Sequence, residues 1–259
     1  MKKISLALGG GAARGLVHIG IFKYLEEGNI EIEEISGTSM GAIIGSLIAF
    51  GMTFEEIKDF AKSMNYLKLV DIDFKTGLLK GNKIEKKLEE IFGDKKIEDT
   101  KISLKIVATN IETSESTIFR KGKIVDAIRA SISLPGIFIP KEIDGNIYLD
   151  GGIMMNLPVE ALDGKNILAV SALKINTGKI IKNKKYFGLN FKTGFLKNNF
   201  EIIKRAVIAM MKVNEEQSLK TLNKNITLIR PNFGDLDIIH FNKVDEFIEI
   251  GYSEIKKIF

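Results

Sequence analysis

The chain has 259 residues, of which 45% are hydrophobic and 27% charged, so it is long and apolar enough to bury a core. It has no cysteine, which excludes disulfides and thiolate zinc sites, and only two histidines, His18 and His240. The net charge of +5 fits a solvated surface or weak attraction to anionic lipid head groups. Aromatic residues interleave no basic stripe, which argues against a nucleic-acid partner.

The first part of the chain alternates short apolar runs with helical patterns. Strands and helices are expected in turn at 4–8, 16–27, 31–36 and 40–50. Thr53 followed by Glu56 predicts a capping box at the start of another helix. The apolar run near the N-terminus is too short for a signal peptide, and 40–52 is too short to span a membrane. We therefore expect a cytoplasmic protein, with peripheral contact to a membrane surface as the alternative.

The rest of the chain continues the alternation. Ile84, Leu88 and Ile91 share one helical face, and Asp144 with Gly145 predicts a hairpin turn. Further strands are expected at 104–108, 116–119 and 167–170, and further helices at 199–222 and 244–258. The segment from about 174 to 198 has little periodicity and predicts a loop or lid. The pattern favours one α/β domain over 1–259, with a mostly parallel central sheet and helices on both faces.

The first motif is the glycine loop GGGAARG at 9–15, between an expected strand and an expected helix. Small residues let backbone N–H groups approach a ligand closely, and a helix N-terminus favours negative charge. Leu16 stands where a Walker loop needs lysine, and Arg14 stands at the third glycine position of a dinucleotide fingerprint. The loop is therefore a candidate for holding an oxyanion, with a ligand-free turn or a nucleotide site as alternatives.

The second motif is GTSMG at 37–41, which sets Ser39 between an expected strand and an expected helix, as a nucleophile elbow requires. Gly37 and Gly41 permit the sharp turn that lifts the serine hydroxyl out of the sheet edge. The helix that follows adds positive potential beneath the hydroxyl. The alternative is that Ser39 is a simple N-cap.

Asp150, in LDGG at 149–152, is the third candidate, although an ordinary turn aspartate would look the same. A serine nucleophile needs a base. The order Ser39, Asp150, His240 matches a Ser-His-Asp esterase, but this elbow follows only about the second strand, and His240 lies in an apolar segment. His18 is interpreted as a hydrogen-bonded helix histidine. Direct action of Asp150 on Ser39 is the remaining choice.

Together these motifs resemble those of patatin-like phospholipases, especially the compact bacterial members, over most of the chain. The similar blocks are the glycine loop with His18-Ile19-Gly20 after it, the elbow, 130–140, 150–152, 77–81 and 245–252. The resemblance implies a Ser–Asp dyad, with Ser39 as nucleophile, Asp150 as base and no catalytic histidine. It also implies an oxyanion hole made by the amides of Gly10, Gly11 and Ala12 and supported by Arg14.

The third glycine of the family loop is often present where this chain has Ala12, and alanine is tolerable there if the residue does not need a positive φ. Such an enzyme cleaves fatty acyl esters of phospholipids, lysophospholipids or glycerides through an acyl-enzyme, without metal or cofactor. Apolar residues of 131–139 and 186–196 are candidates for the acyl groove. The alternatives are a non-catalytic lipid-binding or regulatory protein and a Ser-His-Asp esterase that uses His240.

Overall fold

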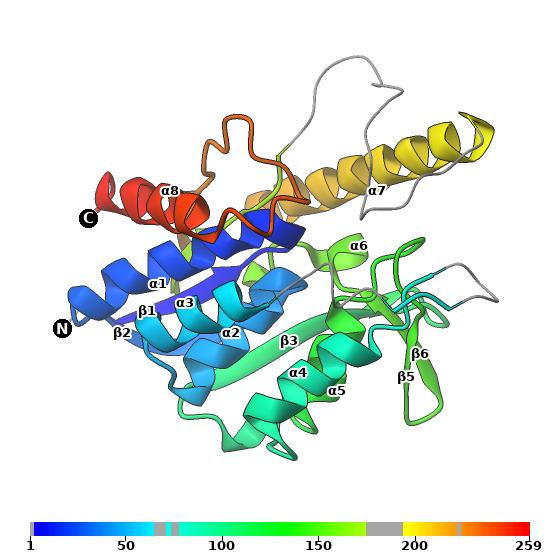
Figure 1. Ribbon diagram of the computed structural model, residues 1–259. Coiled ribbons are helices and arrows are strands. Elements are labelled where there is room, and N and C mark those ends of the chain that lie inside the picture. Colours follow the sequence, from blue (N-terminus) through cyan, green and yellow to red (C-terminus); the bar gives the residue numbers. More distant parts are fainter. Residues whose placement is uncertain (1–2, 65–70, 74–77, 175–193, 222–223) are drawn as a thin grey trace.

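A computed structural model of the chain describes residues 3–64, 71–73, 78–174, 194–221 and 224–259. Figure 1 shows a central sheet with helices packed on either side of it. The strands are β1 (Lys3–Leu8), β2 (Glu31–Thr38), β3 (Ser103–Asn110), β4 (Glu115–Phe119), β5 (Lys141–Ile143), β6 (Asn146–Asp150), β7 (Asn166–Val170) and β8 (Asn225–Ile229). The helices are α1 (Val17–Glu27), α2 (Met40–Phe50), α3 (Phe54–Ser63), α4 (Asn82–Phe92), α5 (Ile124–Ser131), α6 (Gly152–Met155), α7 (Gly194–Thr221) and α8 (Val244–Lys256). Three 3-10 turns join them: η1 (Ala12–Leu16), η2 (Ile97–Asp99) and η3 (Val159–Ala161).

The eight strands form one sheet in the order β5-β6-β3-β2-β1-β7-β8, with β4 paired to β3. The pairs among β3, β2, β1, β7 and β8 are parallel. The strands β4, β5 and β6 pair antiparallel at one side. The prediction of a mostly parallel central sheet is confirmed.

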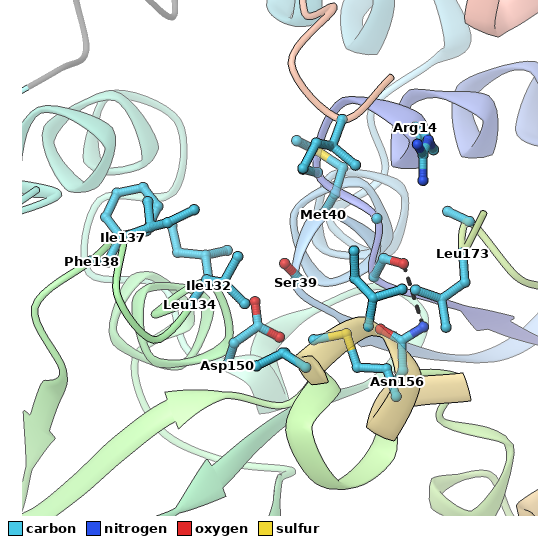
Figure 2. A pocket seen from close by; sticks show the side chains of 18 of the residues that line it. Arg14, Ser39, Met40, Ile132, Leu134, Ile137, Phe138, Asp150, Asn156 and Leu173 are labelled. Atoms are coloured by element: carbon cyan, nitrogen blue, oxygen red, sulfur yellow. Dashed lines mark hydrogen bonds between the residues drawn. The ribbon is translucent and has the colours of Figure 1, made fainter. Parts of the chain in front are cut away.

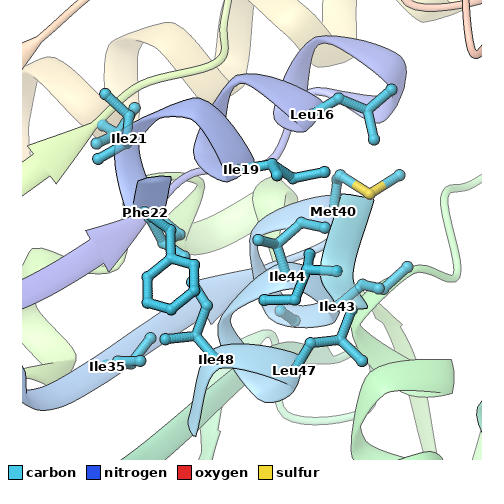
Figure 3. Close-up of a cluster of buried hydrophobic side chains, with 14 of the residues drawn as sticks. Leu16, Ile19, Ile21, Phe22, Ile35, Met40, Ile43, Ile44, Leu47 and Ile48 are labelled. Carbon is cyan, nitrogen blue, oxygen red and sulfur yellow. The ribbon is translucent and has the colours of Figure 1, made fainter. Parts of the chain in front are cut away.

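Successive residues of the central strands are buried on opposite faces of the sheet. Leu6 and Leu8 of β1 join the large cluster that includes α1, α2, α5 and α8. Ala7, between them, packs with Val159 and Leu162 and with Leu219 of α7. Figure 3 shows α1 and α2 meeting through apolar side chains such as Ile19 and Ile44. Helices therefore cover both faces, as the sequence predicts.

The elements lie close to their predicted bounds, with four exceptions. The capping box of α3 is present, with the Thr53 amide donating to Glu56 at 2.8 Å. The helix α7 begins at Gly194, so the loop prediction for 174–198 is wrong at its end, and 175–193 lie outside the described residues. The helix α5, the strand β8 and the one-turn helix α6 were not predicted. The segments of β8 and α6, with five and four residues, are too short to carry a periodicity.

Candidate active site

The two glycine motifs meet at one edge of the sheet. In the parallel pair β1–β2, Leu8 is opposite Gly37, so the loops that follow the two strands lie side by side. Ligands of open α/β sheets bind beyond the carboxyl ends of the strands, which is where both motifs lie. The strand β6 ends at Asp150 and pairs with the end of β3, which brings the third motif to the same edge.

The turn at Ser39 is strained and held in place by a neighbouring helix. Ser39 has φ 55° and ψ −122°, a conformation that non-glycine residues rarely adopt. Its amide donates to Ser131 Oγ at 2.8 Å, and Ser131 Oγ donates to the Val107 carbonyl at 2.6 Å. The Ser39 side chain makes no capping bond to α2, so the N-cap interpretation does not explain this serine.

The two glycines of the elbow are required by close backbone packing. A Cβ on Gly41 would lie 2.0 Å from the Leu8 carbonyl oxygen. A Cβ on Gly37 would lie 2.4 Å from the Gly41 carbonyl oxygen. Both contacts are with backbone atoms. A larger residue at Gly41 would therefore push the elbow away from the end of β1, and one at Gly37 would distort the elbow itself.

The Asp150 carboxylate lies close to the Ser39 hydroxyl and points towards it (Figure 2). Its side chain is 2% exposed, and its Oδ1 accepts a hydrogen bond from the Gly152 amide at 2.8 Å. Burial raises the pKa of Asp150 to about 6, against the opposing effects of the Gly152 amide and the Ser39 hydroxyl. The carboxylate is therefore a stronger base than an exposed aspartate and is ionised at neutral pH.

The glycine loop is fixed through three consecutive carbonyl groups. The Gly9 carbonyl accepts from His18 Nε2 at 2.8 Å, and the Gly11 carbonyl accepts from the Arg14 amide at 3.1 Å. The Gly10 carbonyl accepts from Asn156 Nδ2 at 3.4 Å. A carbonyl oxygen has no proton to donate, so in this bond the His18 Nε2 carries the proton.

The three backbone amides expected in the oxyanion hole differ in whether they already have a hydrogen-bond acceptor. The Gly10 amide donates to the Asn156 carbonyl at 3.2 Å, so it is already bonded within the protein. In the part of the chain that the structure describes, the amides of Gly11 and Ala12 donate to no acceptor. Of the three amides expected in the oxyanion hole, the Gly10 amide is therefore already bonded within the protein, and only those of Gly11 and Ala12 have no acceptor among the described residues.

The structure also bears on the expectations for Ala12 and Arg14. Alanine is unstrained at position 12 only if its φ is negative. Ala12 has φ 49°, so its backbone is strained. The Arg14 guanidinium is turned towards Asp237, which it contacts at 2.7 Å, and towards the Lys174 carbonyl. Arg14 therefore supports the loop by tying it to the segment before α8. Burial lowers the pKa of Arg14, against the attraction of Asp237.

Ser39 and Asp150 open into a cavity of about 170 Å³ whose walls are mostly apolar. Five residues of the predicted wall at 131–139 line it: Ile132, Leu134, Pro135, Ile137 and Phe138. Gly10, Gly11, Ala12, Arg14 and Asn156 also line it. The remaining described walls are apolar and come from Met40, Ile43, Leu79, Ile84, Ala172, Leu173, Val207, Ile208, Met211, Ile238 and Phe241. The predicted wall at 186–196 falls on residues whose side chains lie outside the described part.

Neither histidine hydrogen-bonds to Ser39 or Asp150 in the described structure. His240 Nδ1 accepts from the Asp237 amide at 3.0 Å, and His240 does not line the cavity. His18 is fully buried, and burial lowers its pKa to about 4, so it is neutral. The geometry thus gives no support to a Ser-His-Asp triad.

Three residues of the site carried no sequence signal of their own. Ser131 lies within the 130–140 block but was not singled out, and Asn156 and Asp237 lie in no motif. Each acts through a residue far away in the chain, respectively Ser39, Gly10 and Arg14. The spacing of Asn156, six residues after Asp150, is the one local hint, since a short helix there returns the chain to the cavity.

Comparison with known proteins shows the family to which the chain belongs. Residues 6–163 match the family described as "Patatin-like phospholipase". An uncharacterized NTE family protein of Mycobacterium bovis is 38% identical over 178 residues, covering 67% of this chain and 49% of that protein. Lysophospholipase NTE1 of Kluyveromyces lactis is 32% identical over 272 residues, covering 97% of this chain and 19% of that protein.

A solved structure, VipD from Legionella pneumophila, covers 99% of this chain and 66% of its own, with a TM-score of 0.54 at 16% identity. That likeness concerns the fold. The chain spans about half the length of the mycobacterial relative and about a fifth of the fungal one. Since the family match includes the glycine loop, the elbow and Asp150 and extends over more than half of the chain, this protein belongs to the patatin-like phospholipase family.

Proposed function

We propose that the protein is a serine lipid acyl hydrolase in which Ser39 is the nucleophile and Asp150 the base. The observation that carries this proposal is that one apolar cavity is lined by a strained serine, a buried carboxylate with a raised pKa, and two loop amides that have no acceptor among the described residues. A relative matched along nearly the whole chain is named a lysophospholipase, which supports the same reaction class.

In the proposed reaction, Ser39 Oγ attacks the carbonyl carbon of an ester while its proton passes to Asp150. The carbonyl oxygen becomes an oxyanion, which the amides of Gly11 and Ala12 stabilise; one such donor is typically worth about 3 kcal/mol. The bond to the alcohol then breaks, and Asp150 returns the proton to the leaving oxygen. Water attacks the acyl-enzyme with Asp150 again taking a proton, which releases the fatty acid and restores Ser39.

The walls of the cavity support a fatty acyl chain as the group next to the serine. Its described lining is dominated by Ile, Leu, Val, Met and Phe side chains, and only a few polar side chains, among them Ser39 and Asp150, reach it. Apolar walls with a few convergent polar groups are typical of small-molecule sites. We propose phospholipids, lysophospholipids or glycerides as the substrate class.

The helix α7 supports contact with a lipid surface. Val207, Ile208 and Met211 line the cavity, while Ile202, Met210 and Val213 of the same helix are each about half exposed. Among the described residues, no element covers this second apolar face of the helix. The net positive charge favours an anionic lipid surface as that partner. Among the described residues, no helix is long and apolar enough to cross a bilayer.

The test is hydrolysis of p-nitrophenyl esters of short and long acyl chains by folded wild type, Ser39→Ala, Asp150→Asn and His240→Ala. We expect turnover by the wild type and His240→Ala, and a loss of at least about a thousandfold in the other two variants. Loss of activity in His240→Ala would favour a triad. A folded wild type that binds lipid vesicles without turning over any ester would favour the non-catalytic alternative.

A further inference from the structure

Asn156 lies where the cavity, the glycine loop and the Asp150 segment meet. It follows α6, is 1% exposed and lines the cavity beside Ser39 and Asp150 (Figure 2). It contacts Gly10 twice. Its carbonyl accepts from the Gly10 amide at 3.2 Å, and its side-chain Nδ2 donates to the Gly10 carbonyl at 3.4 Å. The proposed reaction gives this residue no part.

The second contact bears on the oxyanion hole through the geometry of the peptide bond. The Gly10 carbonyl and the Gly11 N–H belong to one planar trans peptide unit, so the two groups point in opposite directions. Fixing the carbonyl against Asn156 therefore turns the Gly11 N–H away from Asn156. A hydrogen bond to the carbonyl also polarises the peptide unit and strengthens its N–H as a donor.

We propose that Asn156 is a positioning residue, whose side chain aims and polarises the Gly11 amide for the oxyanion; this rests on the function proposed above. The Arg14 amide has the same relation to Ala12, because it donates to the Gly11 carbonyl in the next peptide unit. That bond comes from the backbone of the loop itself. The bond to Gly10 comes from a side chain 146 positions away, so a substitution can remove it selectively.

The position of Asn156 also couples the oxyanion hole to the base. A Cβ added to Gly152 would lie 2.9 Å from Asn156 Oδ1 and 3.0 Å from Asp150 Oδ1. The two side-chain oxygens therefore both lie next to Gly152. The single turn of α6 separates the two residues in the chain. One short segment thus carries the base at its start and the group that orients an oxyanion donor at its end.

Asn156→Ala and Asn156→Asp separate this role from a merely structural one. Both remove the donor to the Gly10 carbonyl, and the aspartate keeps the shape of the side chain. We expect kcat on a long-chain p-nitrophenyl ester to fall about 10- to 100-fold, part of the effect of losing an oxyanion donor, with KM changed less than threefold. Asn156→Asp should in addition move the acid limb of the pH profile to higher pH, because a second carboxylate lies near Asp150.

Asn110→Ala is the matched control, because Asn110 is also buried and its Nδ2 donates to the Asn146 side chain, at 3.2 Å. It should leave kcat within about threefold of the wild type. An unchanged kcat in both Asn156 variants, or a loss confined to KM, would overturn the proposal.

A second readout does not depend on turnover. In protein labelled with ¹⁵N-glycine, the Gly11 amide resonance should shift in both Asn156 variants, whereas the resonance of Gly93 should stay in place. An unmoved Gly11 resonance overturns the positioning role whatever the activity of the enzyme. Absence of any Ser39-dependent turnover, with Gly11 shifted, would instead remove the proposed function and leave the contact standing.

Discussion

At the scale of single residues, the site combines two features that cost stability. Asp150 is a carboxylate without a cationic partner among its hydrogen bonds, held in a buried position that raises its pKa to about 6. Ser39 is held at a positive φ by its neighbours. Active sites often retain such strain because the reaction needs it. Each feature therefore predicts how a substitution changes the stability of the fold, whatever it does to activity.

The first prediction concerns Asp150→Asn. The folded pKa of Asp150 lies above the unfolded value of 3.8, so the carboxylate destabilises the folded protein once the pH exceeds both values. The neutral amide should stabilise the protein by roughly 3 kcal/mol above about pH 6, and this gain should vanish as the pH falls towards 4. Urea unfolding of wild type and variant across that range measures it. A gain that is independent of pH would contradict the assigned pKa shift.

The second prediction compares Ser39→Gly with Ser39→Ala. Both remove the hydroxyl and should be inactive. Only glycine relieves the positive φ of 55°, so Ser39→Gly should be more stable than Ser39→Ala by about 1 kcal/mol. Thermal or urea unfolding of the two variants side by side gives the difference. Equal stability would mean that the elbow carries no backbone strain.

At the scale of elements, the site depends on loops that follow neighbouring parallel strands. The end of β1 and the end of β2 are in register, which brings the glycine loop beside the elbow. The helix α5 then supports the elbow through Ser131, which bonds both to the Ser39 amide and to the Val107 carbonyl of β3. The serine hydroxyl is thus positioned by two elements besides its own turn.

Ser131→Ala should therefore lose activity as well as stability. It leaves a buried amide and a buried carbonyl without their partner, which should cost about 2 kcal/mol. Ser36→Ala is the matched control, because Ser36 is equally buried and donates to the Pro158 carbonyl at 2.7 Å, away from the cavity. Both variants should unfold more easily, but only Ser131→Ala should lower kcat, by about tenfold or more. Equal kcat in the two variants would remove Ser131 from the support of the elbow.

Features of the site that leave a local sequence pattern could be predicted, whereas those that depend on contacts between distant residues could not. Strands, helices and the glycine motifs leave local patterns, so the sheet edge where the site forms was predictable. Asp237, Asn156 and Ser131 act on residues 223, 146 and 92 positions away, and the fold alone brings such pairs together. The φ of Ala12 and the bond of the Gly10 amide likewise depend on tertiary contacts rather than on residue type.

At the scale of the whole molecule, α7 connects the cavity to the outer surface. In Figure 1 the yellow part of α7 extends beyond the helices around it. Its later turns are anchored by Asn214, which donates to the Ile153 carbonyl, and by Glu215, which accepts from Ser171 and pairs with Arg230. The apolar stripe of Ile202, Met210 and Val213 on this helix has no covering element among the described residues.

If a lipid surface covers that stripe, Met210→Glu and Val213→Glu should weaken binding to anionic phospholipid vesicles at least tenfold in a co-sedimentation assay, because each buries a charge in the interface. Hydrolysis of a short water-soluble ester should change little. Ile111→Glu adds the same charge at another exposed apolar residue, outside α7, and should bind as the wild type does. Equal binding by all four proteins would remove α7 from the membrane contact.

The central claim is that Ser39, activated by Asp150, attacks acyl esters. Labelling with a long-chain alkyl fluorophosphonate tests it most directly, since Ser39 Oγ would displace fluoride from phosphorus and remain covalently phosphonylated. We expect mass spectrometry to locate one label, on Ser39, in wild type and His240→Ala. The labelling rate should rise with pH through about 6 as Asp150 ionises, and Asp150→Asn should label at least about a hundredfold more slowly. A folded wild type that stays unlabelled, or that carries its label on another residue, would contradict the account.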